Sequence, residues 1–296
     1  MLKEKDILHI IETKDLKIGF NNKIYLNEDY VLKVCYNKKR EDKFLKEIEF
    51  YKEKEYSFMP RLIQSDTSKS IIPFYYIIIS RIKGNNLFRI WSTLSNYERI
   101  SVLKQLRKIM TIFHIKDETG IDYKNIYFKE FDKYLDNIIS NKTMTENQIG
   151  FLLEKRNQLY NHYYMNSCYR IHGDLQFNNI IYLPDGTIKI IDFEHIEYAP
   201  LEKEYYQILR MLSNPNGFCN IDNSSSIDES SFKSFENMAY DILSEIKYNE
   251  FSEYNIFLFD YLNSLRWISK YPECKRYQKV LYEKVKKYGG IYERNN

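Results

Sequence analysis

The chain has no long apolar segment. Its longest apolar run, Ile71 to Ile79, has the length of a strand and is interrupted by Pro73, whereas a membrane-spanning helix needs about 18 or more apolar residues in succession. The residues from Met1 to Asp6 are mostly charged and lack the apolar core of a secretion signal. We therefore expect a cytoplasmic protein that has no membrane partner.

Cysteine is scarce: the sequence contains four cysteines in 296 residues, and they lie far apart. No two have the spacing of zinc ligands or of a redox pair, so we expect isolated thiols in a reducing compartment. The formal net charge of +3 is too small to indicate a nucleic-acid-binding protein. We expect a monomer whose partners are small molecules, with no nucleic-acid partner.

The first 80 residues alternate between short apolar runs and one helical pattern. Phe44, Leu45, Ile48 and Tyr51 have helical spacing between Glu41 and Glu55. Strand followed by strand, helix, strand and strand is an α+β arrangement. The predicted strands are Lys17 to Tyr25, Tyr30 to Tyr36, Arg61 to Ser65 and Phe74 to Ser80.

After Lys83 and Gly84 the pattern becomes mainly helical. Ser95 and Glu98 have the spacing of a capping box, which predicts a helix from there to Phe113. A strand hairpin with a turn at Pro184 interrupts the later helices. The other predicted elements are helices at 128–139 and 146–164, strands at 180–183 and 188–193, a polar loop at 214–231, and helices that begin at Glu202, Phe232, Tyr254 and Lys275. We expect two lobes, 1–80 and 85–296, joined by a hinge at 81–84.

The strongest chemical signal is the run from Ile171 to Ile180, which contains His172, Asp174 and Asn179. An Asp two residues after a His, followed five residues later by an Asn, matches the spacing of a kinase catalytic loop. Such an Asp takes the proton of the acceptor hydroxyl, and the Asn offers an amide oxygen to Mg²⁺, which prefers oxygen ligands. Asp174 is therefore the candidate base and Asn179 a candidate metal ligand.

Asp192 completes this pattern, because it follows the predicted strand Ile188 to Ile191. A carboxylate at a strand end can reach a cleft, bind Mg²⁺ and, through the ion, hold nucleotide phosphates. Neither the loop motif nor Asp192 alone is a specific signal of a kinase, since His-x-Asp is common by chance and Asp192 could simply cap a turn. Their order in the chain, with the hairpin between them, favours the functional interpretation.

The motifs His172 to Asn179 (HGDLQFNN) and Ile191 to Glu194 (IDFE) resemble those of the aminoglycoside phosphotransferase and choline kinase group, which are small-molecule kinases with a two-lobed, protein-kinase-like fold. Protein kinases usually carry Arg in place of Gly173 and Gly in place of Glu194. The resemblance extends over most of the chain. Within the group, the segment Arg81 to Gly84 (RIKG) and the chain length are similar to the 2″-aminoglycoside phosphotransferases.

The resemblance implies a phosphate-binding lysine on the third strand, and Lys33 lies there between apolar neighbours. It also implies a glutamate partner on the following helix, for which Glu47 is our choice. Glu41 and Glu49 remain alternatives. A solvent-exposed lysine and an ordinary surface glutamate are the simpler interpretations of these residues.

The nucleotide base should then pair with the hinge near Ser80 and Ile82, with Ile82 and Ile191 as apolar walls. The phosphate-covering loop departs from protein kinases, because Gly19 is its only glycine. His172 is expected to orient the catalytic loop and not to transfer protons. The implied cofactors are Mg²⁺ and either ATP or GTP as the phosphate donor.

Residues 221–260 contain nine acidic and two basic residues, which gives this segment a charge of −7. Such a surface would attract a cationic acceptor, although a solvated helix face explains it equally well. The aromatic residues between Phe257 and Trp267 could form a cation-π site for a quaternary amine, but a place in the core is the simpler interpretation.

We therefore expect a kinase that transfers the terminal phosphate of ATP or GTP to a hydroxyl of an aminoglycoside, which would confer antibiotic resistance. A kinase of another metabolite, such as choline or an amino sugar, is the alternative. An inactive kinase-like binding protein is less consistent with intact Lys33, Asp174, Asn179 and Asp192. A protein kinase is disfavoured by Gly173 and by the missing activation-segment pattern.

Overall fold

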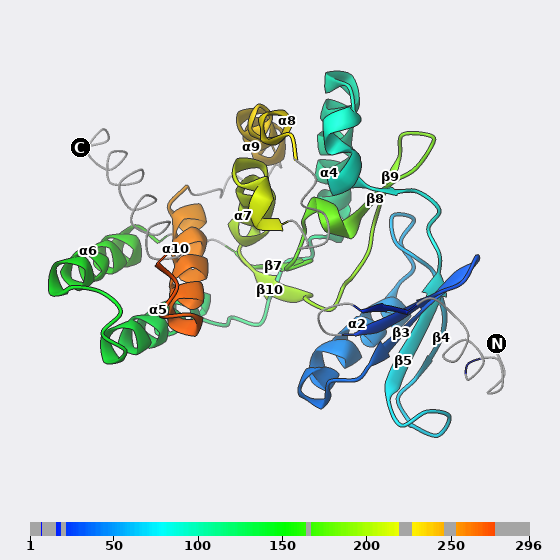
Figure 1. The fold of residues 1–296 in the computed structure, drawn as a ribbon, viewed down its shortest axis with the longest axis horizontal. Helices are drawn as coiled ribbons and strands as arrows, with labels where there is room; N and C mark the ends of the chain where they lie inside the picture. Colours follow the sequence, from blue (N-terminus) through cyan, green and yellow to red (C-terminus); the bar gives the residue numbers. More distant parts are fainter. Residues whose placement is uncertain are drawn as a thin grey trace. The chain divides into compact units, whose positions relative to one another are not determined.

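The computed structural model describes residue 7 and residues 16–18, 22–163, 167–218, 227–245 and 253–275. The chain divides into two compact units, each made of separate segments. Figure 1 colours the chain by residue number, so the segments of each unit can be located by colour. The first consists of residues 1–113, 172–197 and 207–245, and the second of residues 114–171, 198–206 and 246–296. The predicted hinge at 81–84 falls inside the first unit, and its function as a hinge stays a prediction.

The first unit begins with an antiparallel sheet of five strands in the order β1-β2-β3-β5-β4. Helix α2 (Glu41–Glu53) follows β3 and packs against β4 and β5. This arrangement confirms the predicted α+β fold with an N-terminal antiparallel sheet and one helix. The strands are β1 (Leu16–Ile18), β2 (Lys23–Leu26), β3 (Tyr30–Cys35), β4 (Leu62–Asp66) and β5 (Tyr75–Ser80).

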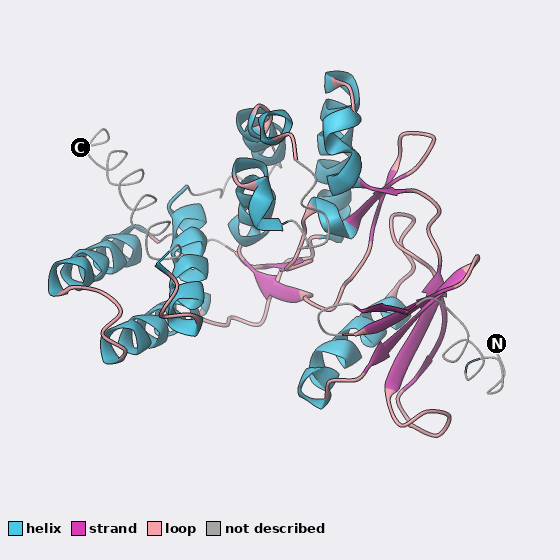
Figure 2. Ribbon diagram, in the orientation of Figure 1, coloured by secondary structure: helices cyan, strands magenta, loops and turns pink. Residues whose placement is uncertain are grey.

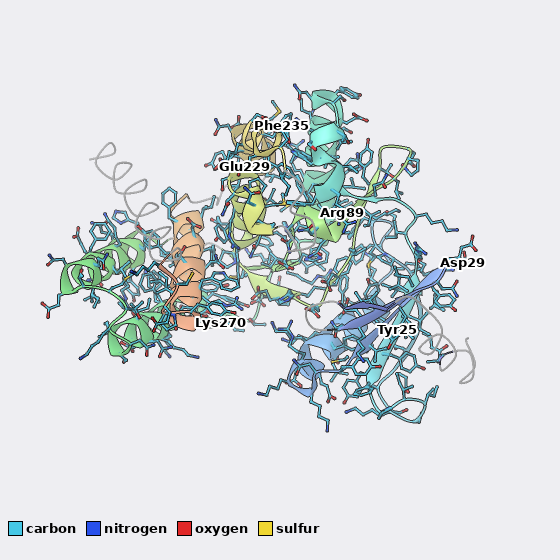
Figure 3. The ribbon with its side chains drawn as sticks, viewed as in Figure 1. Tyr25, Asp29, Arg89, Glu229, Phe235 and Lys270 are labelled. Atoms are coloured by element: carbon cyan, nitrogen blue, oxygen red, sulfur yellow. The ribbon has the colours of Figure 1, made fainter. Side chains whose placement is uncertain are left out.

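Alternation along β3 determines which side chains enter the core of this sheet. Leu32 and Val34 are fully buried and share a cluster with Tyr25 of β2. Lys33, between them, must point to the opposite face, because successive side chains of a strand alternate. In Figure 3, Tyr25 lies in the sheet, whereas Asp29 lies at the exposed turn between β2 and β3.

The rest of the first unit combines helices with a small sheet in the order β6-β8-β9 (Figure 2). Helix α4 (Asn96–Phe113) begins at the predicted capping box: the amide of Glu98 donates to Ser95 Oγ, and the amide of Ser95 donates to Glu98 Oε2. The other elements are β6 (Asn85–Asn86), α3 (Leu87–Ile90), β8 (Ile180–Tyr182), β9 (Ile188–Ile190), α8 (Glu229–Lys233) and α9 (Glu236–Ser244).

The second unit is built mainly from three helices. Helix α10 (Glu253–Lys270) packs against α5 (Tyr123–Ser140) and α6 (Glu146–His162). A two-stranded sheet pairs β7 (Tyr169–Ile171) with β10 (Glu197–Ala199), and helix α7 (Leu201–Ser213) contributes residues to both units. Among the described helices, none combines the length and the apolar character required to cross a bilayer.

Some predicted boundaries were wrong. The strand predicted from Lys17 to Tyr25 is two strands, β1 and β2, which pair as a hairpin with Ile18 opposite Lys23. Helix α5 begins well before Phe128, because the Asp122 side chain caps it by accepting a hydrogen bond from the amide of Asn125. The loop predicted at 214–231 contains a 3₁₀ turn at Pro215–Phe218, and its residues 219–226 lie outside the described part. So do residues 276–296 of the helix predicted from Lys275.

Candidate active site

Lys33 is the centre of the nucleotide side of the candidate site. Its Nζ lies 2.7 Å from Glu47 Oε2 and 2.6 Å from Asp192 Oδ1. Only 8% of the lysine side chain is exposed. Helix α2 provides Glu47 from the face that is directed at the sheet, and Asp192 follows β9. A strand, a helix and a post-strand segment thus converge on one ammonium group.

The alternative glutamates of the sequence analysis do not contact Lys33. Glu41 forms a salt bridge of 2.8 Å with Lys69, and Glu49 is exposed on the outer face of α2. Burial by itself would lower the pKa of Lys33, but the carboxylates of Asp192 and Glu47 together raise it above its ordinary value. The lysine is therefore a permanent cation at neutral pH.

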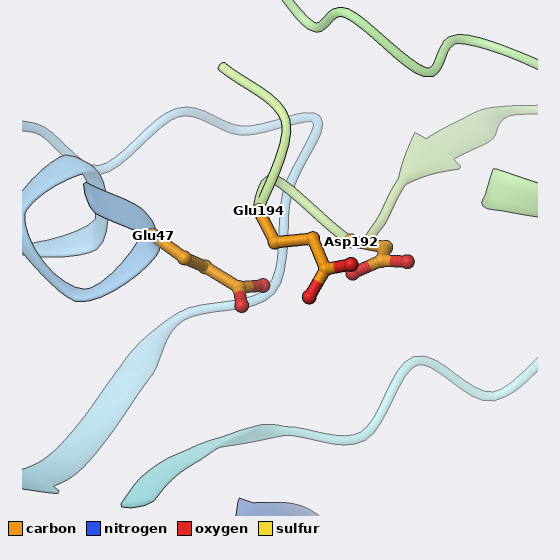
Figure 4. Close-up of side chains that lie close together, drawn as sticks. All are labelled: Glu47, Asp192 and Glu194. Atoms are coloured by element: carbon orange, nitrogen blue, oxygen red, sulfur yellow. The ribbon is translucent and has the colours of Figure 1, made fainter. Parts of the chain in front are cut away.

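Glu47, Asp192 and Glu194 place carboxylate oxygens within 4.8 Å of one another (Figure 4). Such a cluster could hold a metal ion, yet Lys33 already offsets part of its negative charge, and Glu194 Oε2 also lies 3.8 Å from this ammonium. The three carboxylates differ in exposure: 36% of the Asp192 side chain is accessible, against 2% for Glu47 and 6% for Glu194. Asp192 is thus the member that can face a ligand.

The backbone at Asp192 is in a strained conformation, with a φ of 67°. A non-glycine residue in this left-handed region costs about 1 kcal/mol or more, and such residues cluster at functional sites. The next residue, Phe193, is buried and anchors the turn. Its ring packs against those of Tyr51, at 5.7 Å, and His172, at 4.9 Å.

Gly173 is required by the shape of the catalytic loop. Its φ is 76°, and a Cβ atom at this position would lie 2.1 Å from the carbonyl oxygen of His195. This explains why the chain has glycine where protein kinases carry arginine. His172 lies beside it: the ring Nε2 is 3.1 Å from the carbonyl oxygen of Ile191, and the amide of Asp174 donates to Nδ1 at 3.4 Å. The imidazole thus ties the loop to the end of β9.

Asp174 accepts hydrogen bonds from two side-chain amides of its own loop. Asn179 Nδ2 donates to the carbonyl oxygen of Asp174 at 2.9 Å and to its Oδ2 at 3.1 Å, and Gln176 Nε2 lies 3.2 Å from Oδ2. Asn179 Oδ1 forms no hydrogen bond within the described residues. Burial raises the pKa of the Asp174 carboxyl, although His195, His172 and Asn179 act in the opposite direction. A raised pKa suits a base that must gain a proton.

The backbone groups predicted to contact the nucleotide base differ in whether they already form hydrogen bonds. The amide of Ser80 donates to Arg61 at 2.9 Å, and the amide of Arg81 donates to Asp29 at 2.9 Å, so neither is available to a ligand. Ile82 is half-buried, and in the described part of the chain its N–H and C=O form no hydrogen bond. Ile191 is half-buried as well, and Gly19 lies outside the described residues.

Sequence reasoning overlooked Gln176, which donates to Asp174, and Arg40, which donates to Glu194. It placed Asn22 in the phosphate-covering loop but did not find its hydrogen bond to Glu194. Gln176 could have been found, because it lies inside the catalytic motif. Nothing near Asn22 or Arg40 in the sequence indicates their distant partner. All three belong to the first unit, as do Lys33, Glu47, Asp174, Asn179 and Asp192.

The acidic segment predicted at 221–260 is only partly described, and several of its acids have structural partners. Asp228 caps helix α8, Glu229 pairs with Lys233, and Glu245 pairs with Arg107. The aromatic residues of α10 fit the simpler interpretation, since Phe257, Phe259 and Tyr261 are buried. The acceptor-binding side chains therefore stay unassigned.

No protein-family model and no curated protein matches this chain. Solved structures do. The streptomycin–ATP ternary complex of APH(2″)-IIa is 17% identical, with a TM-score of 0.66 over 95% of this chain and 94% of that one. ADP-bound aminoglycoside phosphotransferase APH(2″)-Ib is 16% identical, with a TM-score of 0.63 over 96% and 95%. Choline kinase LicA from Streptococcus pneumoniae is 13% identical, with a TM-score of 0.56 over 96% and 97%.

At these identities the likeness establishes the fold. The chain has the fold of aminoglycoside phosphotransferases and choline kinases, which confirms the resemblance found in its motifs.

Proposed function

We propose that this chain is a small-molecule kinase that transfers the terminal phosphate of ATP or GTP to a hydroxyl group of an aminoglycoside. One observation carries the proposal: within a single compact unit, a buried lysine is paired with Glu47 and Asp192, and a loop holds Asp174 beside Asn179. These are the parts that phosphoryl transfer requires.

The nucleotide would bind through Lys33 and Ile82. The Lys33 ammonium is a permanent cation, so it can hold nucleotide phosphates once these compete with Asp192 for it. The base can pair with the N–H and C=O of Ile82, because both groups form no hydrogen bond within the described residues. Ile191, which is half-buried, would provide an apolar wall.

The donors for a divalent metal fit Mg²⁺. Asn179 has an unbonded amide oxygen, and Asp192 has an accessible carboxylate, and both are hard oxygen ligands. When bound, the ion would neutralise charge on the phosphates. The chain's own residues do the rest: Asp174 orients the acceptor hydroxyl and accepts its proton, while Lys33 steadies the donor. Catalysis would come from positioning and electrostatics, without a covalent intermediate.

The aminoglycoside acceptor is supported by the fold, since the streptomycin–ATP complex of APH(2″)-IIa matches over 95% of the chain. Choline kinase LicA matches over a similar share, so a metabolite acceptor is the competing outcome. The test is a coupled assay of nucleotide turnover with ATP and with GTP, against aminoglycosides, choline and amino sugars, with Asp174→Asn as the blank. Turnover that depends on choline or an amino sugar, with none on any aminoglycoside, would reassign the acceptor. No Asp174-dependent turnover with any of them would refute the kinase.

A further inference from the structure

Glu194 is the most heavily bonded carboxylate of the candidate site. Asn22 Nδ2 donates to Glu194 Oε2 at 2.8 Å, and Arg40 Nη2 donates to Oε1 at 2.9 Å. His195 Nε2 lies 3.3 Å from the same Oε1. The two oxygens therefore have different protein partners, and only 6% of the side chain is exposed. This environment contrasts with that of Asp192, whose carboxylate is accessible.

The two donors come from segments that flank the nucleotide side of the site. Asn22 directly precedes β2 and belongs to the loop that is expected to cover the phosphates. Arg40 is the N-cap residue of α2, the helix that carries Glu47. Glu194 itself comes two residues after Asp192, and its carboxylate points toward those of Glu47 and Asp192 in Figure 4. One side chain thus connects the start of β2, the start of α2 and the Asp192 turn.

The charge of Glu194 is maintained by its surroundings. Burial would raise the pKa of its carboxyl, but His195, Lys33 and Asn22 together hold that pKa well below its ordinary value. A buried carboxylate with several charge-assisted hydrogen bonds is a rigid connection, since loss of one partner leaves a desolvated charge.

We propose that Glu194 is a positioning residue for the nucleotide, which holds the start of β2 through Asn22 and helix α2 through Arg40 against the segment of Asp192. This inference rests on the proposed function. It differs from a metal-binding role, because both Glu194 oxygens are already occupied by protein donors. Nucleotide affinity should therefore depend on Glu194 whether or not a divalent cation is present.

The test measures the dissociation constant of ADP by titration calorimetry, with Mg²⁺ and with EDTA, for wild type, Glu194→Gln, Arg40→Met and the double variant. Each single change should weaken ADP about tenfold, because each removes a charge-assisted hydrogen bond. The double variant should be little worse than either single one, since the two residues act through one contact. The acceptor KM should stay within about twofold of the wild-type value, as neither variant is expected to touch the acceptor.

Two further variants separate positioning from general loss of structure. Lys39→Met removes an exposed cation from the same turn as Arg40 and should leave ADP binding unchanged. Arg40→Lys keeps the charge and should restore part of the affinity that Arg40→Met loses. Melting temperatures of all variants are recorded alongside.

Four results would overturn the inference. If the Glu194→Gln and Arg40→Met variants had a lower melting temperature but unchanged ADP affinity, Glu194 would stabilise the fold without positioning the nucleotide. A loss of affinity confined to the samples with Mg²⁺ would make it a metal ligand. Wild-type protein that binds no nucleotide would refute the proposed function together with this inference, whereas wild-type binding with unaffected variants would refute the inference alone.

Discussion

The two halves of the candidate site are held together by different forces. Around Lys33, one ammonium offsets part of the charge of three clustered carboxylates, and most of this ionic group is buried. Around Asp174, the carboxylate receives hydrogen bonds from neutral amides of its own loop. The first half is assembled from residues far apart in the sequence, whereas the second comes from one short segment.

This difference indicates which half must change when a nucleotide binds. Lys33 and Asp192 neutralise each other, so phosphates can take the lysine only if that ion pair rearranges. Asp174 has no ion pair that must break, because its hydrogen-bond donors are neutral amides. Nucleotide binding should therefore be sensitive to the ion pairs, and the chemical step to the loop.

The largest effect should come from the loop. Asp174→Asn keeps the size of the side chain but removes the base, so kcat should fall about 10²- to 10⁴-fold. The dissociation constant of ADP should stay within about twofold, since the Lys33 half remains intact. Rapid-quench or coupled kinetics together with calorimetry would measure both. A variant that kept its kcat would contradict the assignment of Asp174.

Removing the cation of the other half should produce the opposite pattern. Lys33→Met leaves buried carboxylates without their ammonium, which should cost about 3 to 5 kcal/mol of stability at neutral pH and weaken nucleotide binding. The exposed Lys46 on the same helix as Glu47 provides the control Lys46→Met, which should change neither.

The stability deficit of Lys33→Met should depend on pH. Burial already raises the pKa of Glu47 to about 7 in the wild type, although Lys33 acts in the opposite direction. Without the cation, the pKa values of the clustered carboxylates should rise, that of Glu47 still further above its value in the unfolded chain, so the folded variant binds more protons than the unfolded one. Its stability is then greatest at acidic pH and is lost as the pH rises through those values. The gap in melting temperature between variant and wild type should widen from pH 5 to pH 8. A constant gap would indicate that the carboxylates are not coupled through Lys33.

The sequence predicted the loop half of the site better than the ionic half. Asp174 and Asn179 could be found from their spacing, because the residues that orient them lie within a few positions. Lys33 was found because the resemblance implied a lysine on the third strand and its apolar neighbours fit that position. The contacts of Glu194 with Asn22 and Arg40 could not, since these side chains are 172 and 154 residues away from it.

The fold, too, was predicted best where the signals are local in the sequence. Hydrophobic periodicity and capping residues predicted the first sheet, α2 and the start of α4, because these signals are local. The strand predicted from Lys17 to Tyr25 was wrong because it ran through Gly19, Asn21 and Asn22, which favour a turn and lie between β1 and β2. By contrast, the reason for Gly173 is a carbonyl oxygen of His195, which only the folded chain brings close.

Substitution of Gly173 should cause a loss of folding stability of intermediate size. Gly173→Ala should cost about 3 kcal/mol or more, because it combines the strain of a positive φ with a clash against backbone. Gly186→Ala is the matched control: its φ is 81°, but the added Cβ would find only Tyr182 Oη, at 3.5 Å. It should cost about 1 kcal/mol. Chemical denaturation would compare the two, and equal losses would show that the contact with His195 is unimportant.

The smallest effect concerns Tyr51, which lies between the two halves. Its ring packs on Phe193, as does that of His172, while its buried hydroxyl has no hydrogen-bond partner among the described residues. Tyr51→Phe should therefore stabilise the ligand-free protein by about 1 kcal/mol, because it removes an unsatisfied polar group and keeps the ring. Tyr76→Phe should have the opposite sign, since the Tyr76 hydroxyl accepts a hydrogen bond from Gln64 at 3.1 Å. Denaturation curves of both variants without nucleotide would decide, and a destabilised Tyr51→Phe would mean that this hydroxyl has a partner and that the junction of the two halves is polar.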